Sequence, residues 1–92
     1  MAQATLELPS LLRTVLGGRA SLSVEGETVT DALEDAYRQI PALRVHLCDE
    51  SGNLRRHVLC FHNDINTRWV EGSSPRLKDG DCITIMQAVS GG

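Results

Sequence analysis

Apolar and polar residues alternate in several short stretches of the chain, and turn residues separate these stretches. Residues 4–8 and 20–26 carry apolar side chains at every second position, as strands with one buried face do. Residues 57–62 are mostly apolar and predict another strand, and residues 82–89 predict the last, with Ile83 and Ile85 on one face and Met86 on the other. The sequence KDGD at 78–81 has the composition of a tight turn ahead of that last strand. The pattern therefore predicts a sheet that contains at least four strands.

The stretch between residues 28 and 41 has the period of a helix instead. Its apolar residues recur at spacings of three and four and would form one stripe: Val29, Ala32, Leu33, Ala36, Tyr37 and Ile40. Thr28 is expected to cap the first turn, with Asp31 three residues further on as its partner. Pro41 marks the approximate end of the helix. One face of this helix must be buried against the sheet.

The remaining elements are shorter. Ser10 is expected to cap one or two helical turns that end at Gly17-Gly18. Asn63-Asp64 predicts a tight hairpin that leads into a short edge strand containing Trp69. Residues 42–56 include a turn cluster and are otherwise left unassigned. The predicted order is strand, strand, long helix, strand, short strand, strand, which gives an α+β fold: a small mixed sheet with one main helix packed on one face.

The composition fits one small domain over residues 1–92, with 89–92 as a flexible tail. Hydrophobic residues make up 41 % of the chain and charged residues 23 %. The net charge of −3 lacks the basic field that nucleic-acid or anionic-membrane binding requires. We see neither a secretory signal nor a membrane-spanning run. The three cysteines are an odd number, which favours reduced thiols and a cytoplasmic location.

The end of the chain carries the most specific pattern. The turn Asp79-Gly80-Asp81, the strand 83–85, Val89 and the terminal pair Gly91-Gly92 resemble the ubiquitin-like β-grasp sulfur carriers, which include the small subunits of the thiamine and molybdopterin pathways. GETVTDAL at 26–33 and Asn63-Asp64 support the resemblance. LPSLLR and GGR within 8–19 further resemble carriers for cysteine or specialised-metabolite biosynthesis. Two departures are the missing proline near Gln87, and Cys60 and His62 at positions where the family has inward aliphatics.

The resemblance implies a protein co-substrate rather than an enzyme. In the family, an E1-like adenylyltransferase uses its own ATP to adenylate the terminal carboxylate. A sulfurtransferase or sulfide source then forms a thiocarboxylate, which donates sulfur to a downstream synthase. Here the reacting carboxyl would belong to Gly92, with Gly91, Ser90 and Val89 as the docking tail. The chain itself would bind no cofactor.

Glycine suits this end because a missing Cβ lets the backbone enter a narrow active site. The same tail would serve a ubiquitin-like modifier that joins Gly92 to lysine, and the sequence leaves this alternative open. A plain binding module, which would not need Gly91-Gly92, is a third possibility. The identity of the sulfur acceptor also stays open.

A partner surface is expected on the sheet. If residues 58, 60 and 62 face the helix, then Leu59, Phe61 and Met86 lie on the open face, by which the family docks its activating enzyme. Several arginines could complement an acidic partner or could simply be solvated: Arg13, Arg55, Arg56, Arg68 and Arg76.

Other chemistries have weaker support. His46-x-Cys48 and Cys60-x-His62 would each place two ligands on one face of an extended segment. Neither has the spacing of a structural zinc site, and cysteines often serve as small apolar core residues. The two carboxylates of the 78–81 turn are too few for calcium. Nothing marks a nucleophile turn or an oxyanion site for a Cys-His hydrolase. We therefore expect neither a metal site nor a catalytic site.

Overall fold

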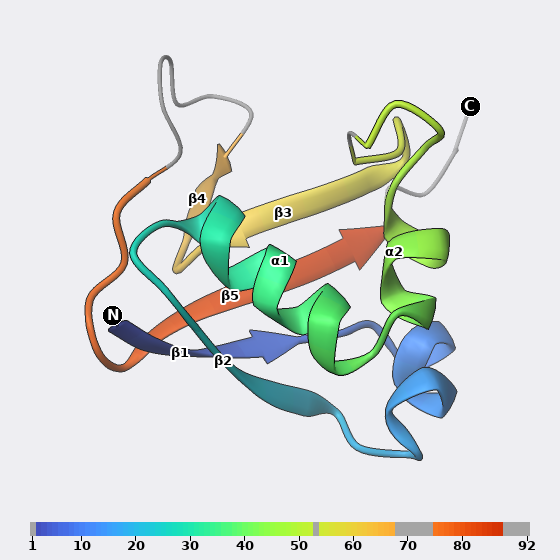
Figure 1. Cartoon of the computed structure of the whole chain (residues 1–92), viewed down its shortest axis with the longest axis horizontal. Helices are drawn as coiled ribbons and strands as arrows, with labels where there is room; N and C mark the ends of the chain where they lie inside the picture. The colour runs from blue at the N-terminus through green and yellow to red at the C-terminus, as the bar shows by residue number, and fades with distance from the viewer. Residues whose placement is uncertain (1, 53, 68–74, 88–92) are drawn as a thin grey trace.

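Five strands form one mixed sheet in the computed structural model, which describes residues 2–52, 54–67 and 75–87 (Figure 1). The strands are β1 (Ala2–Glu7), β2 (Ser21–Gly26), β3 (Val58–His62), β4 (Ile65–Asn66) and β5 (Asp81–Gln87). Their order across the sheet is β2-β1-β5-β3-β4. β1 and β5 are parallel, and the other pairs are antiparallel. The last strand of the chain therefore lies in the middle of the sheet.

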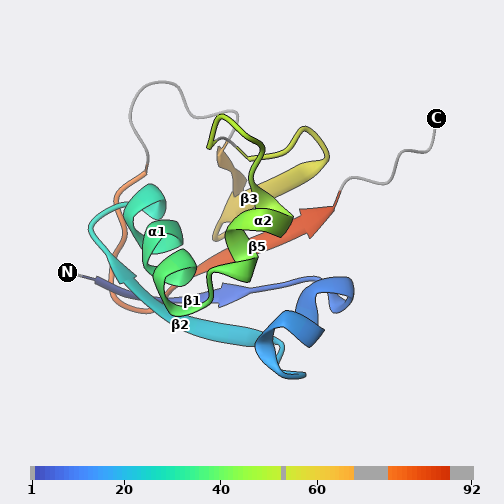
Figure 2. The same cartoon turned by 45° about the vertical axis from the view of Figure 1, so that its right-hand side comes forward.

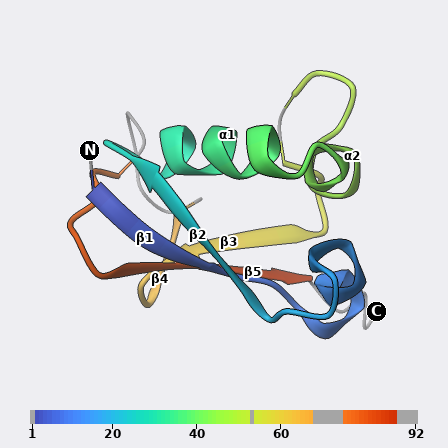
Figure 3. The same cartoon turned by 60° about the horizontal axis from the view of Figure 1, so that its bottom comes forward.

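Two helices, α1 (Val29–Gln39) and α2 (Ala42–Leu47), cover one face of this sheet and leave the other face open (Figure 3). The strands alternate accordingly, so that Leu6 and Val24 point into the core while Thr5 and Ser23 are exposed. The largest fully buried side chains come from the strands and α2: Leu6, Leu43, Leu47, Ile83, Ile85, Val24, Val58 and Cys60. The predicted mixed sheet with one main helix is confirmed.

The long helix also starts as predicted. The Thr28 hydroxyl accepts a hydrogen bond from the backbone N–H of Asp31 at 3.2 Å. Five members of the apolar stripe are buried: Val29, Ala32, Leu33, Ala36 and Tyr37. Gly26, at the end of β2, touches the first turn of α1 so closely that a Cβ would meet the backbone nitrogen of Ala32 at 2.5 Å.

Polar side chains of α1 satisfy backbone groups of the edge strand β2, which α1 crosses in Figure 2. Asp35 accepts from the backbone N–H of Glu25 at 3.0 Å, and the Gln39 amide donates to the carbonyl of Ser23 at 3.0 Å. Unpaired edge groups invite pairing with other chains. These two bonds therefore hold α1 on the sheet and partly occupy its edge.

The first short helix differs from the prediction at its start. η1 (Ser10–Leu16) is a 3₁₀ helix whose capping residue is Pro9, without a side-chain cap, so Ser10 is the first helical residue. The expected Ser10 cap is therefore wrong, because the Pro9 carbonyl accepts the first hydrogen bond of the turn, from the backbone N–H of Leu12 at 2.9 Å, and the helix starts one residue earlier than expected. The end is as predicted, since Gly17 has a φ of 69° and donates to the Thr14 carbonyl.

The other differences concern extents. The unassigned part of residues 42–56 contains α2, directly after α1. The hairpin at Asn63-Asp64 is confirmed, with Asn63 at a φ of 55°, and it leads into β4. Trp69 lies outside the described residues, as do the last two residues of the predicted strand 82–89. In the part of the chain that the structure describes, no helix is long and apolar enough to span a membrane.

Candidate functional site

The predicted reacting residues follow shortly after the central strand β5 in the sequence. Val89, Ser90, Gly91 and Gly92 lie outside the described residues, so the structure defines the base from which they extend. At this base Gln87 pairs with Val58 on one side, and Thr84 is the last residue of β5 paired with β1 on the other. Two ladders therefore fix the position and direction of the strand that carries the tail.

Three apolar side chains predicted to bind a partner are brought together on the open face. Leu59 and Met86 are direct cross-strand partners on β3 and β5, and Phe61 lies two residues along β3 from Leu59. Met86 is 49 % exposed, and the other two are half-buried. Their neighbours Val58, Cys60 and Ile85 are buried on the helix side. We refer to Leu59, Phe61 and Met86 as the apolar patch.

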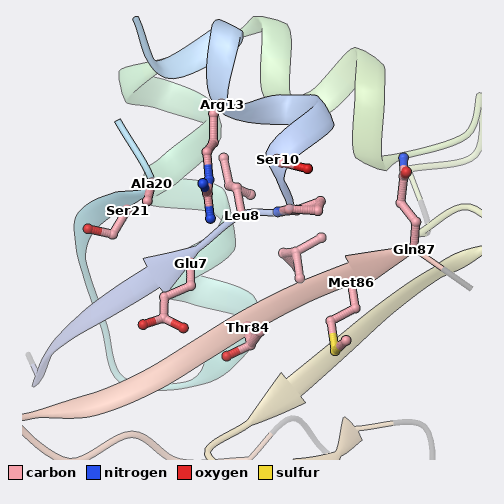
Figure 4. A pocket seen from close by; sticks show the side chains of 11 residues that line it. Glu7, Leu8, Ser10, Arg13, Ala20, Ser21, Thr84, Met86 and Gln87 are labelled. Atoms are coloured by element: carbon pink, nitrogen blue, oxygen red, sulfur yellow. The ribbon is translucent and has the colours of Figure 1, made fainter. Parts of the chain in front are cut away.

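A pocket of about 590 Å³ adjoins this patch, between η1 and the ends of β1 and β5 (Figure 4). Arg13 extends from η1 toward the sheet, while Glu7 and Thr84 project from β1 and β5. The full lining is Glu7, Leu8, Pro9, Ser10, Arg13, Ala20, Ser21, Thr84, Ile85, Met86 and Gln87. We call it the η1 pocket. No sequence pattern predicts this pocket, because Arg13 is one of several arginines that could equally be solvated.

A polar cluster fixes the opposite end of β5. Asp81 Oδ2 accepts from His62 Nε2 at 2.7 Å and from the backbone N–H of Lys78 at 2.9 Å, while Oδ1 accepts from the Asn63 amide at 3.3 Å. The hydrogen bond with His62, followed by that from Lys78, lowers the pKa of Asp81 to about 2. The side chain of His62 therefore joins β3 to the start of β5, a role that sequence reasoning did not find.

The predicted turn at 78–81 also joins β5 to β1. Asp79 Oδ1 accepts from the backbone N–H of Gln3 at 2.9 Å, and the backbone N–H of Gly80 donates to the Gln3 carbonyl at 3.0 Å. Gly80 has a φ of 90°, which glycine adopts without strain. Both aspartates of the turn thus accept hydrogen bonds within the fold, which accounts for the DGD sequence without a calcium ion.

Neither histidine–cysteine pair belongs to a group of three or more possible metal ligands in the described part of the chain. The extended geometry expected for His46 and Cys48 is wrong, because His46 lies in α2 and Cys48 follows its end. Cys48 is buried and donates to the Tyr37 hydroxyl at 3.3 Å. Burial raises the pKa of Cys60 to about 11, which disfavours the thiolate that a nucleophile or ligand needs.

The sheet order, the single main helix and the open apolar face define a ubiquitin-like β-grasp protein. The model of the ThiS family matches residues 6–92, and the chain belongs to this family. It is 34 % identical over 90 residues to the sulfur carrier protein CysO of Mycobacterium tuberculosis, covering 96 % of this chain and 97 % of that protein. The sulfur carrier function predicted from the terminal pattern is therefore confirmed, and with it the assignment as a carrier rather than an enzyme.

Two solved structures extend the comparison. CysO in the Amycolatopsis orientalis BexX/CysO complex is 34 % identical, with a TM-score of 0.83 and coverage of 97 % of this chain and 99 % of that chain. The small archaeal modifier protein 1 of Methanosarcina acetivorans is also 34 % identical, with a TM-score of 0.82 and coverage of 100 % and 98 %. Both share the fold, although their names point to different uses of it.

Proposed function

We propose that the chain carries sulfur as a thiocarboxylate on Gly92. The Gly92 carboxylate would attack the α-phosphate of ATP and release pyrophosphate. Sulfide would then attack the acyl carbon, and AMP would leave with the carboxylate oxygen, so that one oxygen is replaced by sulfur. The observation that carries this proposal is the ThiS family match over residues 6–92, which includes Gly91-Gly92.

In this proposal a partner, an E1-like adenylyltransferase, binds the ATP, and this chain binds no cofactor. A sulfurtransferase or sulfide source and a downstream sulfur-accepting synthase complete the set of partners. The apolar patch, with Met86 half exposed beside the base of the tail, is the surface we assign to the adenylyltransferase. The CysO of Amycolatopsis orientalis was solved together with BexX, which supports partner binding by this fold.

We place this chemistry in the cytoplasm. Cys48, Cys60 and Cys82 are free thiols in the structure, as expected for a reducing compartment. Neither nucleic acid nor membrane is among the partners that we propose, because the net charge of −3 disfavours both.

A second function has one specific observation in its favour. The 34 % identical relative from Methanosarcina acetivorans is named a small archaeal modifier protein. On that precedent Gly92 would be joined to a lysine side chain of another protein after the same activation. The two functions share the adenylate and differ in the nucleophile that attacks it.

Intact-mass measurement separates these functions. The purified chain is incubated with an E1-like adenylyltransferase, ATP and sulfide, and a mass gain equal to the difference between sulfur and oxygen is expected. The controls are a chain truncated before Gly91, which should show no gain, and Gly92→Ala, which should fold normally but be activated poorly because its methyl enters the narrow site. Lysine-linked adducts in a lysate, without a thiocarboxylate, would favour the modifier function instead.

A further inference from the structure

Positive charge gathers at the end of the sheet from which the tail extends, although the chain as a whole carries −3. Arg13 lies in η1, and Arg19 follows it. Arg55 and Arg56 come just before β3, whose first residue pairs with Gln87 of β5. A separate pocket beside the end of β2 and the start of α1 is lined by four acidic side chains together with one arginine: Glu25, Glu27, Asp31, Glu34 and Arg38. Four arginines thus lie near the end of β5, with Glu7 among them in the lining of the η1 pocket.

The side chain of Arg13 differs from the others at this end. Arg19 Nε donates to the Leu16 carbonyl at 3.3 Å, Arg55 donates to the Val45 carbonyl at 3.2 Å, and Arg56 also has an interaction within the fold. Among the described residues, the guanidinium of Arg13 has neither a hydrogen bond nor an ion pair. It extends into the η1 pocket with its donors free (Figure 4).

The η1 pocket offers an apolar floor beside this charge. Leu8 and Ile85 are buried residues in its lining, and Met86 belongs both to the pocket and to the apolar patch. The pocket is therefore continuous with the surface assigned above to the activating enzyme. Its volume of about 590 Å³ accommodates one or two side chains of a partner. Glu7 also lines it and forms no ion pair with Arg13.

We propose that the η1 pocket receives an acidic segment of the activating enzyme. A carboxylate of that segment lies against Arg13, and an apolar side chain next to it lies over Leu8 and Met86. Glu7 repels a second carboxylate, so the segment can dock in one register only. This inference rests on the proposed function, because it assigns a contact to the enzyme that adenylates Gly92.

The test measures pyrophosphate release by the E1-like enzyme as the carrier concentration is varied. Arg13→Glu should raise the KM for the carrier by about tenfold or more and leave kcat nearly unchanged, since the chemistry at Gly92 is untouched. Arg13→Lys, which keeps the positive charge, should have a KM close to that of the parent chain. Glu7→Gln should lower KM. Arg19→Glu is the matched control, because it makes the same charge change on the neighbouring cation outside the pocket.

Each outcome either supports or overturns the proposed contact between Arg13 and the activating enzyme. Equal KM values for Arg13→Glu and Arg19→Glu would show only a long-range charge effect and overturn the specific contact. An unchanged KM for Arg13→Glu, with slower sulfur transfer afterwards, would assign the pocket to a later partner and also overturn the proposal. Thermal melting of each variant verifies folding. If the unaltered chain releases no pyrophosphate and gains no sulfur, the proposed function fails instead, and that result is distinct from any difference between variants.

Discussion

Met86 provides a direct measure of how much the apolar patch contributes to partner binding. Its side chain is 49 % exposed, so roughly half of its surface remains to be buried. Complete burial of such a side chain is worth about 1.5–3 kcal/mol. Burial of the remaining half in an interface should therefore contribute about 0.7–1.5 kcal/mol, which is roughly a 3- to 12-fold change in affinity. Met86→Ala should raise the KM for the carrier by this factor.

The assay again follows pyrophosphate release by the adenylyltransferase. Val45→Ala is the control, because Val45 is a large apolar residue that is 68 % exposed but lies on α2, on the helix side of the sheet. Both variants should melt close to the parent chain, since neither side chain is buried in the core. A normal KM for Met86→Ala, or an equal increase for Val45→Ala, would refute the assignment of the open face.

Three further predictions concern stability and reactivity. Gly26→Ala should lower the free energy of unfolding by about 1–3 kcal/mol in chemical denaturation, because its methyl meets the first turn of α1. Because folding lowers the pKa of Asp81 from 3.8 to about 2, the ionised carboxylate stabilises the fold above pH 3.8. This stabilisation is lost as the pH falls toward 2. The melting temperatures of Asp81→Asn and the parent chain should therefore differ at pH 6 and converge near pH 2. Iodoacetamide, followed by peptide mass spectrometry, should label Cys82 first, because Cys48 and Cys60 are buried; equal labelling in the folded protein would contradict this.

The main elements could be predicted from periodicity, but α2 could not. Leu43, Val45 and Leu47 alternate with polar residues as a strand would, and they also fit a helix with Leu43 and Leu47 four residues apart. Six residues are too few for the two periods to separate. In the structure Leu43 and Leu47 are fully buried while Val45 is exposed, so packing against the core decided what the local pattern left open.

The sulfur carrier family could be predicted because its pattern, the turn 79–81 with strand 83–85 and Gly91-Gly92, is linear in sequence. The η1 pocket depends on residues brought together by the parallel pairing of β1 with β5, whose paired residues, such as Leu6 and Ile83, are 77 positions apart in sequence. No local pattern reveals that the guanidinium of Arg13 has no partner among the described residues, while Arg19 and Arg55 each have one. Whether an arginine has a hydrogen-bond partner can be told only from the positions of the acceptors around it in the folded structure.

The central place of β5 also has a consequence for how the protein folds. During synthesis β1, β2 and α1 emerge first and can form a hairpin covered by a helix, yet the inner edge of β1 has no neighbour until β5 arrives. β3 lacks its larger partner for the same reason, so two strand edges stay open to pairing with other chains. Insertion of β5 between β1 and β3 requires contacts between residues distant in sequence, and we expect this insertion to be the slow step of folding. Because the strand that carries the tail is the one that completes the sheet, a partner that recognises the base of the tail on β5 recognises only the folded chain.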